Sequence, residues 1–131
     1  MTLLDTNVLV YAANQDCEFY ELSNQLIDKA ISGQIAASIS LQILIEFYSV
    51  ITSPKRVEKP LSPEDAVNEI NKYIESEKIR KIQFNENALK ILSNLAKKYN
   101  VIAQDIYDLK IVATMLANGV IEIITANESD F

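Results

Sequence analysis

Residues 3 to 8 read Leu-Leu-Asp-Thr-Asn-Val, a short apolar segment that stops at an acid and continues with two residues of helix-capping type. The pattern predicts a strand at Leu3-Leu4 and a short helix over residues 8–13, with Thr6 or Asn7 as its N-cap. Asp5 then lies at the carboxyl end of a strand, where open parallel sheets bind ligands. Asp5 is equally suited to cap the helix, so this stretch alone leaves two interpretations open.

The rest of the chain alternates between strand-like and helix-like segments. Short apolar runs predict strands at residues 35–39, 79–84 and 120–125, the last with the composition of a strand buried on both faces. Helical spacing and capping residues predict helices over residues 19–31, 40–52 and 105–119, and further helices starting at Ser62 and at Asn85. This alternation indicates an α/β fold with a central parallel sheet.

The composition of the 131-residue chain narrows its possible functions. A net charge of −6 argues against a general nucleic-acid coating protein, although bound cations can invert the local charge of an acidic site. With no histidine in the sequence, Ser-His triads and histidine-containing zinc sites are excluded, and the single Cys17 forms no intramolecular disulfide. The sequence contains no signal-peptide pattern and no apolar run long enough to span a bilayer, so we expect a cytoplasmic protein without a membrane partner.

A short loop runs from residue 53 to residue 65 and holds all three prolines. Helical periodicity resumes directly after it, so we expect one domain over residues 1–131. The loop also carries Lys55, Arg56 and Lys59. These basic residues either contact the phosphate backbone of a nucleic acid or remain solvated, and the sequence alone favours the solvated state.

Acidic residues on two predicted helices are further candidates for chemistry. Glu46 belongs to a narrow polar stripe with Gln42 and Ser49, which either faces a cleft or is simply wetted by water, and the stripe alone favours water. Asp105 and Asp108 are three residues apart and resemble a helix-capping pair. Asp108 is also in line with the apolar ridge of Ile111, Val112 and Met115, which predicts an inward-facing carboxylate, whereas Lys110, Thr114 and Asn118 lie on another side.

Two polar residues follow the last predicted strand. Thr125 and Asn127 lie at its carboxyl end, although Asn127 also suits an ordinary turn. Together with Asp5 and the helical carboxylates, they form a set of oxygen ligands that could converge at one edge of a parallel sheet. Hard cations such as Mg²⁺ and Mn²⁺ favour that set.

The order of these segments resembles the PIN-domain family, particularly the toxin nucleases of VapBC toxin–antitoxin pairs. Leu-Leu-Asp-Thr-Asn-Val at residues 3–8 resembles the family's opening, and Glu46-Phe47 its second acidic position. Asp108-Leu-Lys-Ile-Val-Ala at residues 108–113 resembles the third, and residues 125–131 the closing segment. The proline-containing loop at residues 51–62 is also similar, so the resemblance spans essentially the whole chain.

The resemblance implies a three-layer α/β/α sandwich and a metal-dependent endoribonuclease. Asp5, Glu46 and Asp108 would be the catalytic, metal-binding acids, with Mg²⁺ (or Mn²⁺) as cofactor and water as the nucleophile. Asn7 and Thr125 would support them. Asn127 stands where many members have Asp, which weakens a fourth acidic position, and Asp105 is a rival for that role.

The resemblance also implies partners, namely an RNA substrate, a cognate antitoxin protein and a second copy of the chain. The apolar region around Leu89, Leu92 and Leu95 favours a homodimer, unless that stripe only covers the sheet.

Two alternatives to a toxin nuclease remain, and two others are discounted. A degenerate PIN-like interaction module and a housekeeping RNA-processing nuclease fit the same residues. Aspartyl phosphotransfer normally requires a second Asp two residues after the first, where this chain has Asn7, and Gly33 and Gly119 cannot form a dinucleotide-binding turn.

Overall fold

The structure is a computed structural model that describes residues 1–125. Its centre is a sheet of four strands in the order β3-β2-β1-β4, and every neighbouring pair is parallel. The strands are β1 (Thr2–Leu4), β2 (Ala37–Ser40), β3 (Arg80–Ile82) and β4 (Glu122–Ile124). The predicted parallel sheet is therefore confirmed.

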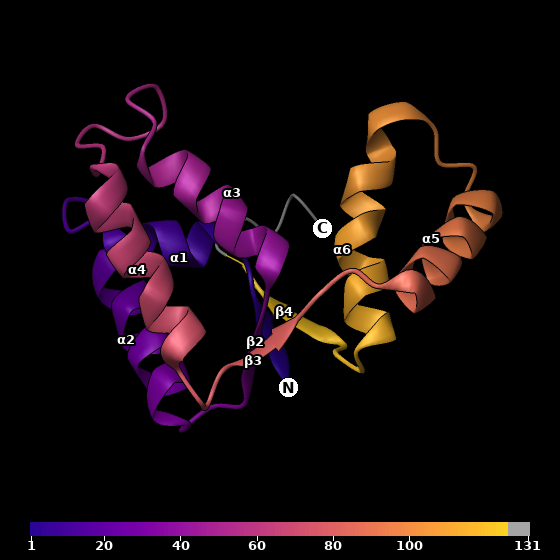
Figure 1. The fold of residues 1–131 in the computed structure, drawn as a ribbon, viewed down its shortest axis with the longest axis horizontal. Coiled ribbons are helices and arrows are strands. Elements are labelled where there is room, and N and C mark those ends of the chain that lie inside the picture. The colour runs from indigo at the N-terminus through magenta and orange to yellow at the C-terminus, as the bar shows by residue number, and fades with distance from the viewer. Residues whose placement is uncertain (126–131) are drawn as a thin grey trace.

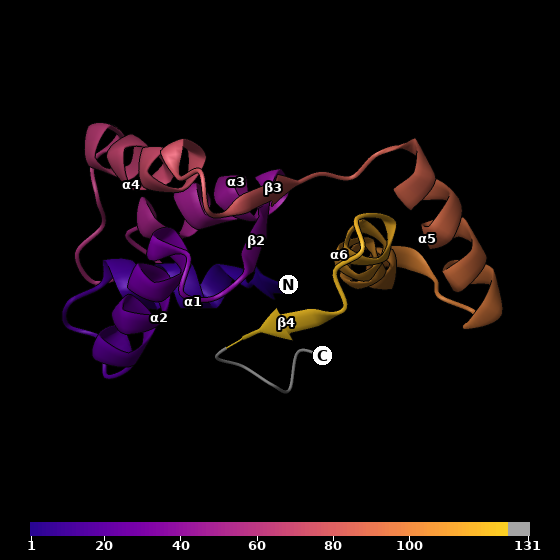
Figure 2. The ribbon, with the colours of Figure 1, turned by 90° about the horizontal axis from the view of Figure 1, so that it is seen from below.

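Six α-helices connect the strands. They are α1 (Thr6–Ala13), α2 (Tyr20–Ser32), α3 (Leu41–Ile51), α4 (Pro63–Glu75), α5 (Glu86–Lys98) and α6 (Ile106–Ala117), and a short 3-10 turn, η1 (Ala103–Asp105), precedes the last. Helices α1 to α4 lie to one side of the strands, and α5 and α6 lie to the other, as both views show (Figures 1 and 2). This is the expected α/β/α arrangement.

The main core lies between the sheet and the first four helices. Leu4 and Ile39 are fully buried because β1 and β2 occupy the middle of the sheet, and Leu9 of α1 and Phe47 of α3 are fully buried in the same cluster. The ring of Phe47 meets that of Tyr73 edge to face, with centroids 6.0 Å apart. These buried side chains hold α3 rigidly above the sheet.

The last strand differs from its prediction. Residues 120–125 were expected to form a strand buried on both faces, but β4 covers only Glu122–Ile124, with Glu122 exposed and Ile123 and Ile124 half-buried. Within residues 1–125, β4 pairs only with β1 and is an edge strand. Apolar composition indicates a strand but does not fix its place in the sheet.

The start of α1 also differs from its prediction. The helix begins at Thr6 rather than Val8, and of the three cap candidates it is Asp5, not Thr6 or Asn7, that caps it. The Asp5 side chain accepts a hydrogen bond from the backbone N–H of Thr6 at 2.8 Å.

The parallel strands bring several chain segments to one edge of the sheet. The carboxyl ends of β1, β2 and β4 lead directly into Asp5, α3 and Thr125, respectively. The backbone N–H of Asp5 donates to the Ile124 carbonyl at 3.1 Å, which fixes the ends of β1 and β4 against each other.

Among residues 1–125, no helix is both long enough and apolar enough to cross a membrane.

Candidate metal centre and acidic groove

A groove of about 650 Å³ opens at the carboxyl edge of the sheet, between the start of α1, the length of α3 and the start of α6. Three of its side chains are carboxylates, and several others are polar. Its lining consists of Asp5, Thr6, Asn7, Gln42, Glu46, Ser49, Val50, Arg56, Tyr107, Asp108 and Ile111. We call this the acidic groove. It collects Asp5, Glu46 and Asp108 from three different elements.

Asp5 is the most buried of the three acids, with 7% of its surface exposed. One carboxylate oxygen accepts from the Thr6 N–H and the other from the Thr125 hydroxyl, both at 2.8 Å. Asp5 therefore caps α1 and lines the acidic groove, so the two interpretations of this residue are compatible. Each oxygen accepts one hydrogen bond in these contacts and has a second lone pair for another partner.

Glu46 projects from the middle of α3 and is held by two neighbours. Its Oε2 accepts from the Thr6 hydroxyl at 3.0 Å, and its Oε1 accepts from the Gln42 side-chain amide at 3.2 Å. Gln42 and Ser49, the neighbouring members of the polar stripe, also line the acidic groove. The stripe therefore faces the acidic groove, with Gln42 and Glu46 half-buried and Ser49 exposed.

Asp108 lines the acidic groove. Its helical spacing predicted that it would face inward with the core residues, and this prediction is wrong. Asp108 is exposed, Ile111 and Val112 are half-buried, and only Met115 of that ridge is buried. Asp108 lies in the first turn of α6, and the start of this helix extends past the sheet (Figure 1). Helical periodicity gives the direction of a side chain but not whether that end of the helix reaches the core.

The side of α6 that carries Lys110, Thr114 and Asn118 does not face open solvent. Thr114 is buried and Asn118 is half-buried, because this side meets the segment after β3. The Asn118 side-chain amide donates to the Gln83 carbonyl at 3.3 Å, and the Lys110 ammonium lies 5.2 Å from the centre of the Phe84 ring.

The four supporting residues predicted from the sequence have different outcomes. Asn7 lines the acidic groove, and Thr125 binds Asp5. Asp105 is exposed and does not belong to the groove, so it lies apart from the other acids. Asn127 lies outside the described residues.

The sequence did not predict the role of Thr6 in joining two of the acids. Thr6 was regarded only as a cap candidate, yet its backbone N–H binds Asp5 while its hydroxyl binds Glu46. It therefore joins two acids that are 41 residues apart in the sequence. A hydroxyl directly after a strand-end acid was a visible signal, but its partner on α3 depends on the tertiary fold.

The residues of the acidic groove suit a hard divalent cation. Asp5 and Glu46 offer carboxylate oxygens held by their neighbours, and Mg²⁺ typically takes one or two protein carboxylates with waters completing its shell. Within residues 1–125, no three acidic, histidine or cysteine side chains lie close enough to share one ion. At most two of the three acids in the acidic groove therefore lie close enough to bind one ion directly.

Residues 2–131 match the family model of the PIN domain, and the chain belongs to that family. The chain is similar to Ribonuclease VapC24 of Mycobacterium tuberculosis, with 23% identity over 131 residues that cover the whole chain and 89% of the relative.

Two solved structures share the fold. Mycobacterium tuberculosis VapC20, described as a sarcin-ricin loop cleaving toxin, superposes with a TM-score of 0.70 at 11% identity, covering 99% of this chain and 92% of that one. A chain of a toxin–antitoxin complex from Klebsiella pneumoniae gives a TM-score of 0.61 at 18% identity, covering 100% and 90%, respectively. These likenesses establish the three-layer fold.

The contribution to stability of the hydrogen bond from the Thr6 hydroxyl to Glu46, which we call the Thr6–Glu46 bridge, can be measured directly. Thr6→Val keeps the side-chain shape but removes the hydroxyl that binds Glu46, so it should lower the free energy of unfolding by about 1 kcal/mol. In a double-mutant cycle with Glu46→Ala, urea unfolding should give a coupling energy of about 0.5–1 kcal/mol.

Glu69→Ala is the matched control, because Glu69 binds Lys72 on α4 and has no contact with Thr6. The losses in the free energy of unfolding caused by Thr6→Val and Glu69→Ala should add in the double variant. Additive effects of Thr6→Val and Glu46→Ala would contradict the bridge.

Proposed function

We propose that this chain is a divalent-metal-dependent endoribonuclease and the toxin of a VapBC-type pair. The observation that carries the proposal is the meeting of Asp5, Glu46 and Asp108 in one groove at the carboxyl edge of a PIN-domain sheet. The similarity to Ribonuclease VapC24 over the whole chain supports RNA as the substrate.

In this proposal, Asp5 and Glu46 hold a Mg²⁺ or Mn²⁺ ion, and Asp108 contributes through its water shell. The bound ion would activate water and neutralise charge on the phosphate. Thr6 and Thr125 orient the two direct carboxylates through the hydrogen bonds described above. Because the sequence has no histidine, the proton acceptors available in the groove are its carboxylates.

Asp5→Asn tests the metal site and the activity together. Asn keeps an acceptor for the Thr6 N–H and caps helices well, while loss of one negative charge relieves repulsion with Glu46. Without metal, we expect the free energy of unfolding of the variant to lie within about 1 kcal/mol of the wild-type value and to be equal or slightly higher. Stabilisation by added Mg²⁺ or Mn²⁺ should shrink, because an ion that binds only the folded state stabilises it by mass action. RNA cleavage should fall at least about a hundredfold.

Asp105→Asn is the matched control, because Asp105 is an exposed acid of η1 that lies outside the acidic groove. It should retain wild-type cleavage and metal response. Undiminished wild-type cleavage in EDTA, or full activity of Asp5→Asn, would overturn the proposed site.

An antitoxin partner is the second proposal, and it rests on the similarity to a chain of a toxin–antitoxin complex. Expression of this chain alone should slow growth, and co-expression of the product of the adjacent gene should restore growth and co-purify with the chain. An active nuclease that leaves growth unchanged would indicate a housekeeping RNA-processing enzyme. A chain that slows growth but does not cleave RNA would indicate a degenerate interaction module.

We also propose that the chain forms a homodimer through α5. Of the three leucines that suggested self-association, Leu92 is buried and Leu95 is half-buried, but Leu89 is 51% exposed. Leu89→Glu should therefore convert a dimer into a monomer in light scattering at micromolar concentration. Ile74→Glu on α4, at a residue 52% exposed, should leave the dimer intact. A monomeric wild-type chain would contradict this proposal.

A further inference from the structure

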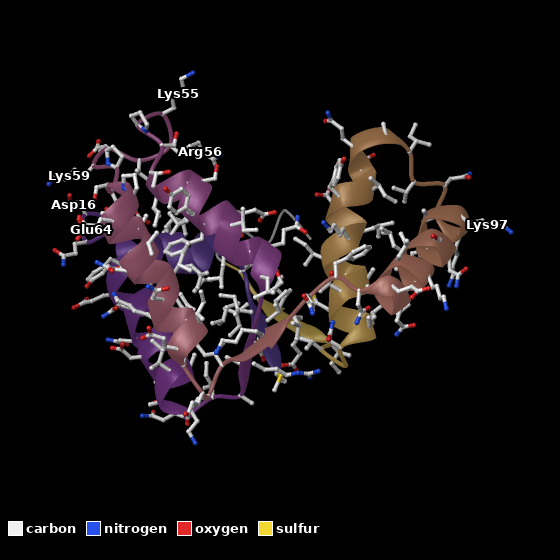
Figure 3. All side chains as sticks on the ribbon, in the orientation of Figure 1. Asp16, Lys55, Arg56, Lys59, Glu64 and Lys97 are labelled. Atoms are coloured by element: carbon white, nitrogen blue, oxygen red, sulfur yellow. The ribbon has the colours of Figure 1, made fainter. Side chains whose placement is uncertain are left out.

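The three basic residues of the loop between α3 and α4 lie in different surroundings. The ammonium of Lys59 pairs with the Asp16 carboxylate at 3.0 Å, on the side of the loop away from the acidic groove (Figure 3). Lys55 projects from the outer end of the loop (Figure 3). Only Arg56 lines the acidic groove, together with Asp5 and Glu46. From the sequence alone, these three residues could not be distinguished.

Arg56 is the one cationic side chain among the described residues that line the acidic groove. It forms no ion pair within residues 1–125, in contrast to Lys59. Its guanidinium therefore keeps its donors free for a ligand, and its planar fork matches phosphate oxygens. A groove with three carboxylates repels a nucleic-acid strand unless cations offset them, so a positive side chain here has a direct electrostatic consequence.

The backbone that carries Arg56 is held in place. Its N–H donates to the Ser53 carbonyl at 3.1 Å, and the next residue, Val57, donates to the same oxygen at the same distance. Leu61 donates to the Ile51 carbonyl at 2.8 Å, and Val57 and Leu61 pack against the core. Because the loop is already ordered, less conformational entropy is lost when Arg56 binds a ligand.

Arg56 and Glu46 lie at different places along the groove. Ile51, the last residue of α3, is five residues beyond Glu46, which is about 7.5 Å along the helix axis. Arg56 follows on the loop after this end. Because Arg56 lies at the far end of α3 (Figure 3), a phosphate beside Arg56 would be a neighbour, on the same strand, of the phosphate at the Asp5–Glu46 centre.

We infer that Arg56 binds a phosphate of single-stranded RNA next to the phosphate at the Asp5–Glu46 centre, and that Lys55 and Lys59 take no part. Arg56 thus positions the strand along the acidic groove and sets its register. This inference rests on the proposed ribonuclease function.

The test is RNA binding as a function of salt, in the Asp5→Asn background with Mg²⁺, where cleavage does not intervene. Anisotropy of a labelled single-stranded oligonucleotide gives the affinity between 50 and 200 mM salt, and the slope of log affinity against log salt reports the number of phosphate contacts. Arg56→Gln should weaken binding about tenfold and reduce the slope of log affinity against log salt by about 0.7, the value for one phosphate contact on a single strand. Arg56→Lys should keep the slope but bind less tightly, because the charge remains and the fork is lost.

Lys55→Gln and Lys59→Gln are the matched controls on the same loop, and both should keep the parent slope. An unchanged slope for Arg56→Gln overturns the inference, and so does an equal loss in all three variants, which would indicate diffuse attraction. With Asp5 restored, Arg56→Gln should raise KM while kcat stays near wild type, as expected for a positioning contact. Failure of the wild-type chain to cleave RNA with Mg²⁺ or Mn²⁺ would instead reject the proposed function itself.

Discussion

The two hydrogen bonds accepted by the Asp5 carboxylate tie together the parts on which the site depends. One comes from the first backbone N–H of α1 and the other from the hydroxyl of Thr125 after β4, so a single buried side chain fixes a helix start and a strand end. A buried charge of this kind is costly unless its oxygens have partners. Thr6 extends the arrangement to Glu46 on α3. The acids are thus held together despite their mutual repulsion, by donors placed between them.

Asp5 can cap α1 and at the same time present a carboxylate to the acidic groove. The N-cap position points a carboxylate at the positive end of a helix, which stabilises the ionised form. The carboxyl edge of a parallel sheet is also where loops leave room for a ligand. Asp5 occupies both positions because the strand ends where the helix begins. A short strand–helix connection therefore gives a rigid acid without a separate supporting loop.

The sequence predicted the fold well because that prediction depended on local patterns. The strands near residues 3, 37 and 80 and the caps Ser40, Ser62 and Asn85 follow from neighbouring residues alone. The errors concern what lies beyond the local pattern. Asp108 has the helical phase of a core residue, but the end of α6 that carries it is exposed to water. Likewise, the bond from Thr6 to Glu46 spans the fold and leaves no periodic signal.

Charge has a further consequence for how an acidic chain holds RNA. With a net charge of −6, most of the surface repels a phosphate backbone, so attraction is confined to places where cations gather. In the acidic groove these would be the metal beside Asp5 and Glu46 and the guanidinium of Arg56. Few phosphate contacts imply a weak dependence of binding on salt and little non-specific affinity. Discrimination between RNAs must then come from the shape of the groove and from base contacts, since the backbone contributes little energy that all sequences share.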